Sequence, residues 1–197
     1  MKAYSYDDPK LGQINYVDGK RYLWLLSVLL PLIPLVGMGL MRWSGQEWTL
    51  WIPLLSLYLG IPLLDYLFPN DTSNPPEQIV PQLEADTYYR ILNHLTVPLH
   101  FVILLCGAWF VARHDLSWSG LLALSLTVGA IGALGINTGH ELGHKKSRLD
   151  RLAARLVLAV SFYGHFSIEH NAGHHAQVAT PEDSASARYG ENIYSFA

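Results

Sequence analysis

The sequence predicts an all-α integral membrane protein, a bundle of four transmembrane helices with one short interfacial helix. Half of its 197 residues are hydrophobic and only 15% are charged. Four apolar runs have the length of about twenty residues that a helix needs to cross a bilayer. Aromatic residues make up 12% of the chain, as expected where rings lie at membrane interfaces.

The first two spans are predicted over residues 22–41 and 48–68. Pro31 and Pro34 should kink the first span, which membrane helices tolerate. The second span follows a short polar turn and carries an acid, Asp65, near its far end. A supporting or proton-relay role for Asp65 and a simple position at the helix end both remain open.

The third and fourth spans are predicted over residues 91–112 and 116–137, after a polar loop at 69–90. His94 and His100 lie in the third span, and we interpret them as hydrogen-bonded residues of the bundle rather than ligands. Small residues in the fourth span should let helices pack closely in lipid. They are Gly129, Gly132 and Gly135.

Basic residues indicate the orientation of the bundle. Four lie in residues 1–21 and five follow the fourth span, whereas the turns at 42–47 and 113–115 hold one each. Cytoplasmic segments carry an excess of Lys and Arg, so the N-terminus and the segment after the fourth span are predicted to be cytoplasmic.

Composition also excludes several classes of protein. The single cysteine, Cys106, rules out an internal disulfide framework and thiolate metal sites. No basic stripe indicates nucleic-acid binding, and the polar residues 1–20 do not form a cleavable signal.

An apolar segment after the fourth span is too short to cross a bilayer. Residues 156–168 number thirteen and follow Arg151 and Arg155, which favours an interfacial helix over about 152–168. Such a helix would return the chain to the membrane face that it left.

Histidines form two clusters on either side of this segment. His140 and His144 are spaced i, i+4, His170 and His174 repeat that spacing, and His175 follows. Residues four apart share one face of a helix, so each pair can bind a metal ion. Imidazole ligands without sulfur suit iron, copper or zinc. The interfacial helix must therefore bring the two clusters together.

Three other residues are candidates for a role near this metal. Glu141 and Glu169 are carboxylates that could act in catalysis by ligating the metal or orienting the imidazole rings. His165 lies five residues before His170 and is a candidate for a supporting position.

Two alternative functions share these features. The run His140–His144 matches H-E-x-x-H, the zinc protease motif, but the second cluster holds more histidines than one zinc requires. A membrane metal transporter would place its ligands near the bilayer midplane, whereas these histidines lie at the ends of spans and beyond.

The two clusters resemble the histidine boxes of one family. His140-Glu141-Leu142-Gly143-His144-Lys145-Lys146 and Glu169-His170-Asn171-Ala172-Gly173-His174-His175 are similar to the first and second boxes of the membrane-bound alkane monooxygenases. The likeness covers essentially the whole chain. Its flanks include Asn137-Thr138-Gly139, Ala179-Thr180-Pro181-Glu182-Asp183, Pro62-Leu63-Leu64-Asp65, Asn74-Pro75-Pro76 and Tyr88-Tyr89-Arg90.

The resemblance implies a non-haem diiron enzyme with six spans in the bacterial inner membrane. It would hydroxylate the terminal methyl group of an alkane with O2 and electrons from rubredoxin. The five histidines carry over as ligands of two irons per full-length chain. A fatty-acid desaturase of the wider histidine-box superfamily is the alternative enzyme.

The family's third histidine box and its Glu-His-Tyr-Gly motif have no counterpart in these residues. Residues 1–197 are therefore expected to be the N-terminal part of a single hydroxylase domain, and inactive alone. Leu57 and Tyr58 are candidates to limit a substrate channel, with plain packing as the alternative. A basic cluster could dock rubredoxin or simply reflect topology. Its members are Lys145, Lys146, Arg148 and Arg151.

Overall fold

The computed structural model describes residues 1–68 and 71–196. Within those residues, four helical segments are long and apolar enough to span a membrane, which confirms the predicted bundle. They are Arg21–Ser44, Glu47–Leu67, Thr87–Arg113 and Trp118–Gly143. The first two residues of the predicted polar loop, 69 and 70, lie outside the described part.

The first span is broken where the prolines predict. Helix α1 (Leu25–Leu29) passes through a 3-10 turn at Leu30–Leu32 into α2 (Ile33–Ser44). Pro31 lies in the turn and lacks the N–H group that an α-helix would need there. Helix α2 ends at Gly45, which takes the left-handed conformation with φ of 71°.

The second span is also irregular. A 3-10 turn (Glu47–Trp51) leads into α3 (Ile52–Leu55), a π-helical turn (Ser56–Gly60) and α4 (Ile61–Leu67). Short π-helical segments inside helices are rare and often mark functional positions. Leu57 and Tyr58 both lie in this turn.

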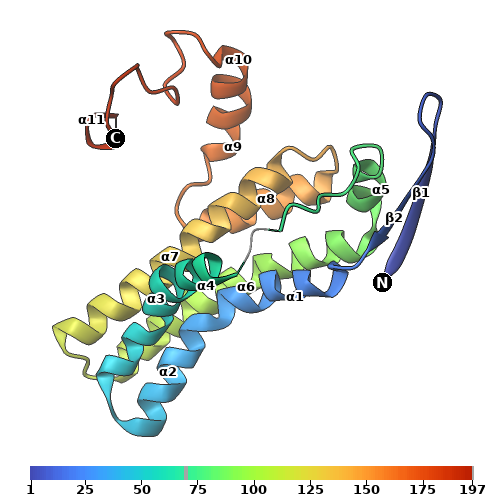
Figure 1. The fold of residues 1–197 in the computed structure, drawn as a ribbon. Helices are drawn as coiled ribbons and strands as arrows, with labels where there is room; N and C mark the ends of the chain where they lie inside the picture. The colour runs from blue at the N-terminus through green and yellow to red at the C-terminus, as the bar shows by residue number, and fades with distance from the viewer. Residues whose placement is uncertain (69–70, 197) are drawn as a thin grey trace.

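The two longest helices, α6 (Thr87–Arg113) and α7 (Trp118–Gly143), lie side by side along the bundle (Figure 1). Each begins at a side-chain cap, since Asp86 accepts from the Tyr88 N–H and Ser117 from the Gly120 N–H. Both extend beyond the apolar runs, so α6 begins before Ile91 and α7 continues past Asn137. Hydropathy marks the depth of the membrane, whereas backbone hydrogen bonds carry the helix on into polar residues.

Two buried clusters hold the bundle together. One joins α2, the start of the second span, α6 and α7, through Met38, Leu50, Phe110, Ala123 and Leu124. The other lies near the opposite end of α7 and joins α6 and α7 to α8, through Val97, Leu142, Ala153, Ala154 and Val157.

The predicted interfacial helix over 152–168 was wrong in its bounds. Helix α8 covers Arg148–Val160, and Ser147 caps its start. The chain then turns at residues 161–165, with Phe162 at φ of 57°, before α9 (Phe166–Ile168). The apolar pattern runs through this turn without a break, so hydropathy alone did not reveal it.

Helix α8 doubles back along the last turns of α7. Its Arg148, Arg151 and Arg155 are exposed, while Val157 and Leu158 are fully buried. This is the one-sided burial expected of an amphipathic helix on a bundle surface. Beyond α9, a π-helical turn (Glu169–His174), α10 (His175–Gln177) and α11 (Ile193–Phe196) project from one end of the bundle (Figure 1).

An element that was not predicted lies at the N-terminus. Strands β1 (Lys2–Asp8) and β2 (Gly12–Asp18) form an antiparallel hairpin, with Tyr4 opposite Tyr16. The hairpin lies beside the short helix α5 (Val80–Ala85) (Figure 1).

A buried carboxylate, Asp86, anchors this hairpin to the bundle. It accepts hydrogen bonds from Lys2 Nζ at 2.8 Å, Tyr4 OH at 2.5 Å and Arg21 at 2.7 Å. The polar N-terminal residues are thus part of the fold at the end of the bundle where the histidines lie.

Candidate metal centre

The two histidine clusters come from different kinds of structure. His140 lies in the last turn of α7, and His144 is the first residue after that helix, with its ring centroid 4.7 Å from that of His140. His170 and His174 lie on the π-helical turn Glu169–His174, and His175 opens α10. A rigid membrane helix therefore carries the first cluster, and a short turn carries the second.

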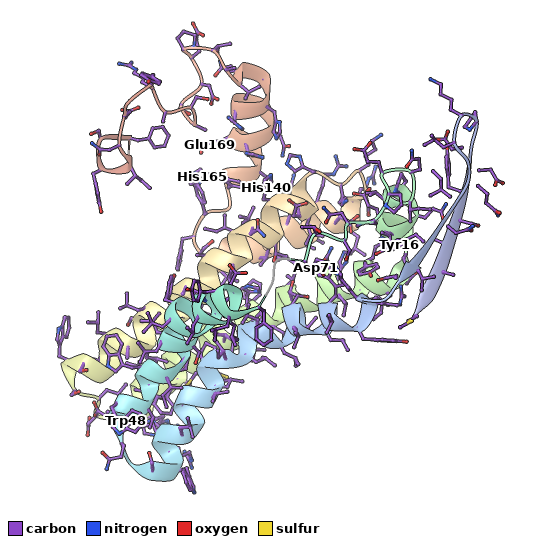
Figure 2. The ribbon with its side chains drawn as sticks, in the orientation of Figure 1. Tyr16, Trp48, Asp71, His140, His165 and Glu169 are labelled. Carbon is purple, nitrogen blue, oxygen red and sulfur yellow. The ribbon has the colours of Figure 1, made fainter. Side chains whose placement is uncertain are left out.

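Three imidazole nitrogens lie close to Nε2 of His170. The Nε2 atom of His170 lies 3.0 Å from Nε2 of His140, 3.3 Å from that of His144 and 3.0 Å from that of His175. The predicted meeting of the two clusters is therefore present. Figure 2 shows His140 on α7 facing the segment that carries Glu169.

This convergence suits a metal ion better than it suits hydrogen bonding. Each ring nitrogen has one proton or one lone pair, so the three contacts of His170 Nε2 cannot all be hydrogen bonds. Two nitrogens bound to one ion at about 2.1 Å and a right angle would lie about 3.0 Å apart, close to the spacing seen here. His140, His144 and His170 also offer ligand atoms that all lie within 4.8 Å of one another.

The surroundings of His144 and His170 favour the neutral form of these two rings. Burial, followed by the neighbouring His140 and His175, lowers the pKa of both His144 and His170. Phe166 covers His170, with their rings stacked at 4.9 Å. A neutral imidazole has the lone pair that a metal ion requires.

His174 has a partner that the sequence did not reveal. Its Nδ1 atom lies 2.9 and 3.1 Å from the two carboxylate oxygens of Asp183. Asp183 also accepts hydrogen bonds from the Ala185 N–H and the Ser186 hydroxyl. The Ser186 hydrogen bond is the largest cause that holds the pKa of Asp183 at about 2. A lone acid in a polar loop offers no spacing signal that would have pointed to this contact.

The two predicted carboxylates do not contact the histidine clusters in this way. Glu169 is exposed and lies 3.7 Å from His165 Nε2, and Glu141 is exposed on α7 (Figure 2 labels Glu169 and His165). Across residues 1–68 and 71–196, neither has a hydrogen bond to any of the five histidines. Asp183 makes the contact with a clustered histidine that was expected of Glu141 or Glu169.

His94 and His100 pair with the bundle, as interpreted from the sequence. Nδ1 of His100 lies 2.7 Å from the Thr96 carbonyl, and Nδ1 of His94 lies 2.8 Å from the Arg90 carbonyl. The other nitrogen of His94 lies 3.0 Å from the carboxylate of Asp150 on α8. Both residues line a cavity of about 720 Å³ between the first span, α6, α7 and the hairpin.

The remaining candidates lie on surfaces. Leu57 is half-buried and Tyr58 is 64% exposed, and neither borders that cavity. Asp65 is exposed on α4. In the basic cluster, Lys145 forms an ion pair with Glu84 at 3.0 Å. The other members follow His144 in the chain and are exposed, and they are Lys146, Arg148 and Arg151.

The chain is similar to proteins of known function. The family model described as fatty acid desaturase matches residues 116–197, which include both histidine clusters. The alkane 1-monooxygenase of Ectopseudomonas oleovorans is 50% identical over 183 residues, 93% of this chain and 46% of the relative.

Two further alkane 1-monooxygenases are similar to this chain to the same degree. Alkane 1-monooxygenase 1 of Alcanivorax borkumensis is 52% identical over 185 residues, 93% of this chain and 45% of the relative. The alkane 1-monooxygenase of Pseudomonas putida is 50% identical over 185 residues, 93% of this chain and 46% of the relative. The chain spans about half the length of the curated relatives it matches.

Proposed function

We infer, since nearly the whole chain is homologous to alkane 1-monooxygenases, that these residues belong to a membrane enzyme that oxidises alkanes to 1-alkanols with O2. The observation that supports this most directly is the approach of three other histidine nitrogens to His170 Nε2. We propose that residues 1–197 form part of a single hydroxylase domain and that the remaining ligands lie outside them.

The metal in this proposal is iron, held as a diiron centre. His140, His144, His170, His174 and His175 are the proposed ligands, because together they offer imidazole nitrogen donors and no sulfur. When bound, iron supplies the activation of O2 that an unactivated C–H bond requires, since no amino-acid side chain can do this.

The protein's own residues bind the metal, shield the ligands and position the substrate. The end of α7 and its C-cap hold His140 and His144 one turn apart, and Phe166 covers the ring of His170. The substrate has no polar group, so apolar walls and shape must position it. The proposed limit on alkane length lies at Leu57, in the π-helical turn of the second span.

Electrons must reach the centre from outside the membrane. We propose that rubredoxin, or another acidic carrier, docks on the exposed Lys146, Arg148 and Arg151, which follow His144 in the chain, because opposite charges steer the encounter. The excess of basic residues at this end supports a cytoplasmic location for the N-terminus and the histidines, with the bundle in the bacterial inner membrane.

A fatty-acid desaturase is the second candidate function, because the matching family model carries that description. Product analysis separates the two. Membranes that contain the protein, supplied with an electron donor, should convert octane to 1-octanol and leave an acyl-lipid substrate unchanged. Metal analysis should find iron. A desaturated acyl product without octanol would overturn the proposal.

A further inference from the structure

We propose that Asp183 is the positioning residue for His174, which it fixes in the tautomer and orientation that direct Nε2 toward a metal ion. This inference rests on the proposed metal centre but does not depend on which substrate the enzyme oxidises. It assigns a role to a residue that lies outside both histidine clusters.

The hydrogen bond determines the tautomer of His174. An ionised carboxylate only accepts hydrogen bonds, so the proton between Asp183 and His174 must lie on Nδ1 of the imidazole. In a neutral ring, Nε2 then has the free lone pair. Carboxylates that accept from the remote N–H of a ligating histidine orient the ring and raise its basicity.

The carboxylate of Asp183 is itself held firmly. Its side chain is fully buried, at 0% exposure, although most residues from 176 to 192 are exposed. The Ala185 N–H donates to one oxygen at 2.9 Å, and the Ser186 hydroxyl donates to the other at 2.6 Å. Groups whose own geometry is locked by further hydrogen bonds make the most reliable supports for a site.

The position of Asp183 also depends on the turn that precedes it. The chain leaves α10 through Ala179, at φ of 64°, and the Asp183 N–H donates to the Thr180 carbonyl at 3.2 Å. These turns bring Asp183 back to a residue nine positions earlier. In the part of the chain that the structure describes, it is the one carboxylate hydrogen-bonded to any of the five clustered histidines.

The test measures the tautomer and metal binding rather than activity. In ¹⁵N-histidine-labelled, metal-free protein, His174 should show the signature of a proton on Nδ1, with the His174→Ala variant identifying its signals. In Asp183→Ala this preference should be lost. Glu182→Ala is the matched control, because it removes the exposed carboxylate next to Asp183 and should leave the His174 tautomer unchanged.

A double-mutant cycle completes the test, with Co²⁺ as the probe. Asp183→Asn should weaken Co²⁺ binding roughly 10–100-fold, as removal of an orienting partner does elsewhere. In a His174→Ala background it should have no further effect, because Asp183 would act through His174. Unchanged affinity, additive losses or an unchanged tautomer in Asp183→Ala would overturn the inference. None of these results would bear on alkane oxidation.

Discussion

Gly139 on α7 lies directly against Leu158 on α8: a Cβ atom at Gly139 would be only 2.6 Å from Leu158 Cγ. The next contact up the helix is similar, since a Cβ at Gly135 would lie 2.8 Å from the His100 ring. These glycines let α8 and α6 approach the segment of α7 that carries the first histidine cluster. Gly129 and Gly132, which were also expected to serve close packing, have no atom within 4 Å of such a Cβ.

The first prediction concerns this contact. Gly139→Ala should displace α8 and destabilise the protein by about 1–3 kcal/mol, as overpacking of a close contact does. Thermal unfolding in detergent and metal content should both decrease. Gly132→Ala is the control, because its methyl group would enter open space and should change neither measurement.

The second prediction concerns His170, whose Nε2 atom lies closest to those of the other histidines. His170→Ala should reduce the affinity for a divalent metal by more than the roughly 10–100-fold that loss of an orienting partner causes. Calorimetric titration of the metal-free protein would measure this. His165→Ala should bind normally, because His165 is exposed and, among residues 1–68 and 71–196, its ring pairs with Glu169 and Tyr163 rather than with the clustered histidines. Equal losses in the two variants would contradict the assignment of the site.

The third prediction concerns Asp86 and the N-terminal hairpin. Asp86→Asn would leave Arg21, which is only 12% exposed, without its closer ionised partner, since Asp18 lies 3.9 Å away, and should cost about 3 kcal/mol of stability at pH 7. Asp71→Asn should cost less than about 1 kcal/mol, because the side chains of Asp71 and its partner Lys20 are 56% and 40% exposed and so are well solvated.

The stabilisation that Asp86 provides should decrease as the pH falls. Hydrogen bonds from Arg21, opposed by burial and helped by Lys2 and Tyr4, hold the pKa of Asp86 well below its usual value of 3.8. The stabilisation is therefore complete above about pH 4 and is lost as the pH falls toward the pKa of the folded state. The difference in melting temperature between the native protein and Asp86→Asn should shrink only below pH 4. A difference that shrank between pH 8 and 5 would exclude this explanation.

The fourth prediction tests the basic docking surface. Replacement of both Lys146 and Arg148 by Glu should slow reduction by rubredoxin about tenfold at low salt and weaken its dependence on ionic strength. Stopped-flow reduction at several salt concentrations would measure both effects. Arg113→Glu, at the far end of α6, is the control. If Arg113→Glu slowed reduction as much as the double replacement, the basic residues would reflect membrane topology alone.

The fifth prediction tests the substrate channel. Leu57→Trp should shift the preferred alkane to a shorter chain, because a larger ring in the π-helical turn would fill space beside it. Tyr58→Trp should have little effect, since Tyr58 is already large and 64% exposed. Gas chromatography of products across a series of alkanes would compare the two variants, and identical profiles would reject Leu57 as the limit.

The sequence predicted those parts of the structure that depend on one strong physical signal. Twenty apolar residues without charge can hardly be anything but a span, so all four spans were found. The spacing of His140 with His144 and of His170 with His174 was equally clear. The ends of α6 and α7 were missed because polar residues continue a helix without any change in backbone hydrogen bonding.

The other elements depend on contacts between residues far apart in the chain. The hairpin was read as a polar tail, because its anchor, Asp86, lies 82 positions from Tyr4. The end of α8 at Val160 was hidden by apolar residues that continue through the following turn. Asp183 was quoted only as a flank of the second cluster, and its contact with His174 arises from turns that no periodic pattern marks.

The doubling back of α8 has a further consequence for how the metal centre assembles. A metal ion that joins His144 to His170 closes a segment of 26 residues, and closing a flexible segment of that length would cost about 3 kcal/mol in loop entropy alone. Since α8 is already packed on α7 by Leu142, Ala153 and Ala154, most of that freedom is lost before the ion arrives. The coupling between metal binding and the packing of this segment is reciprocal, so a bound ion must also stabilise α8 and the residues that follow it. Removal of metal should therefore loosen residues 161–177 first and leave the four spans in place, which hydrogen exchange would show.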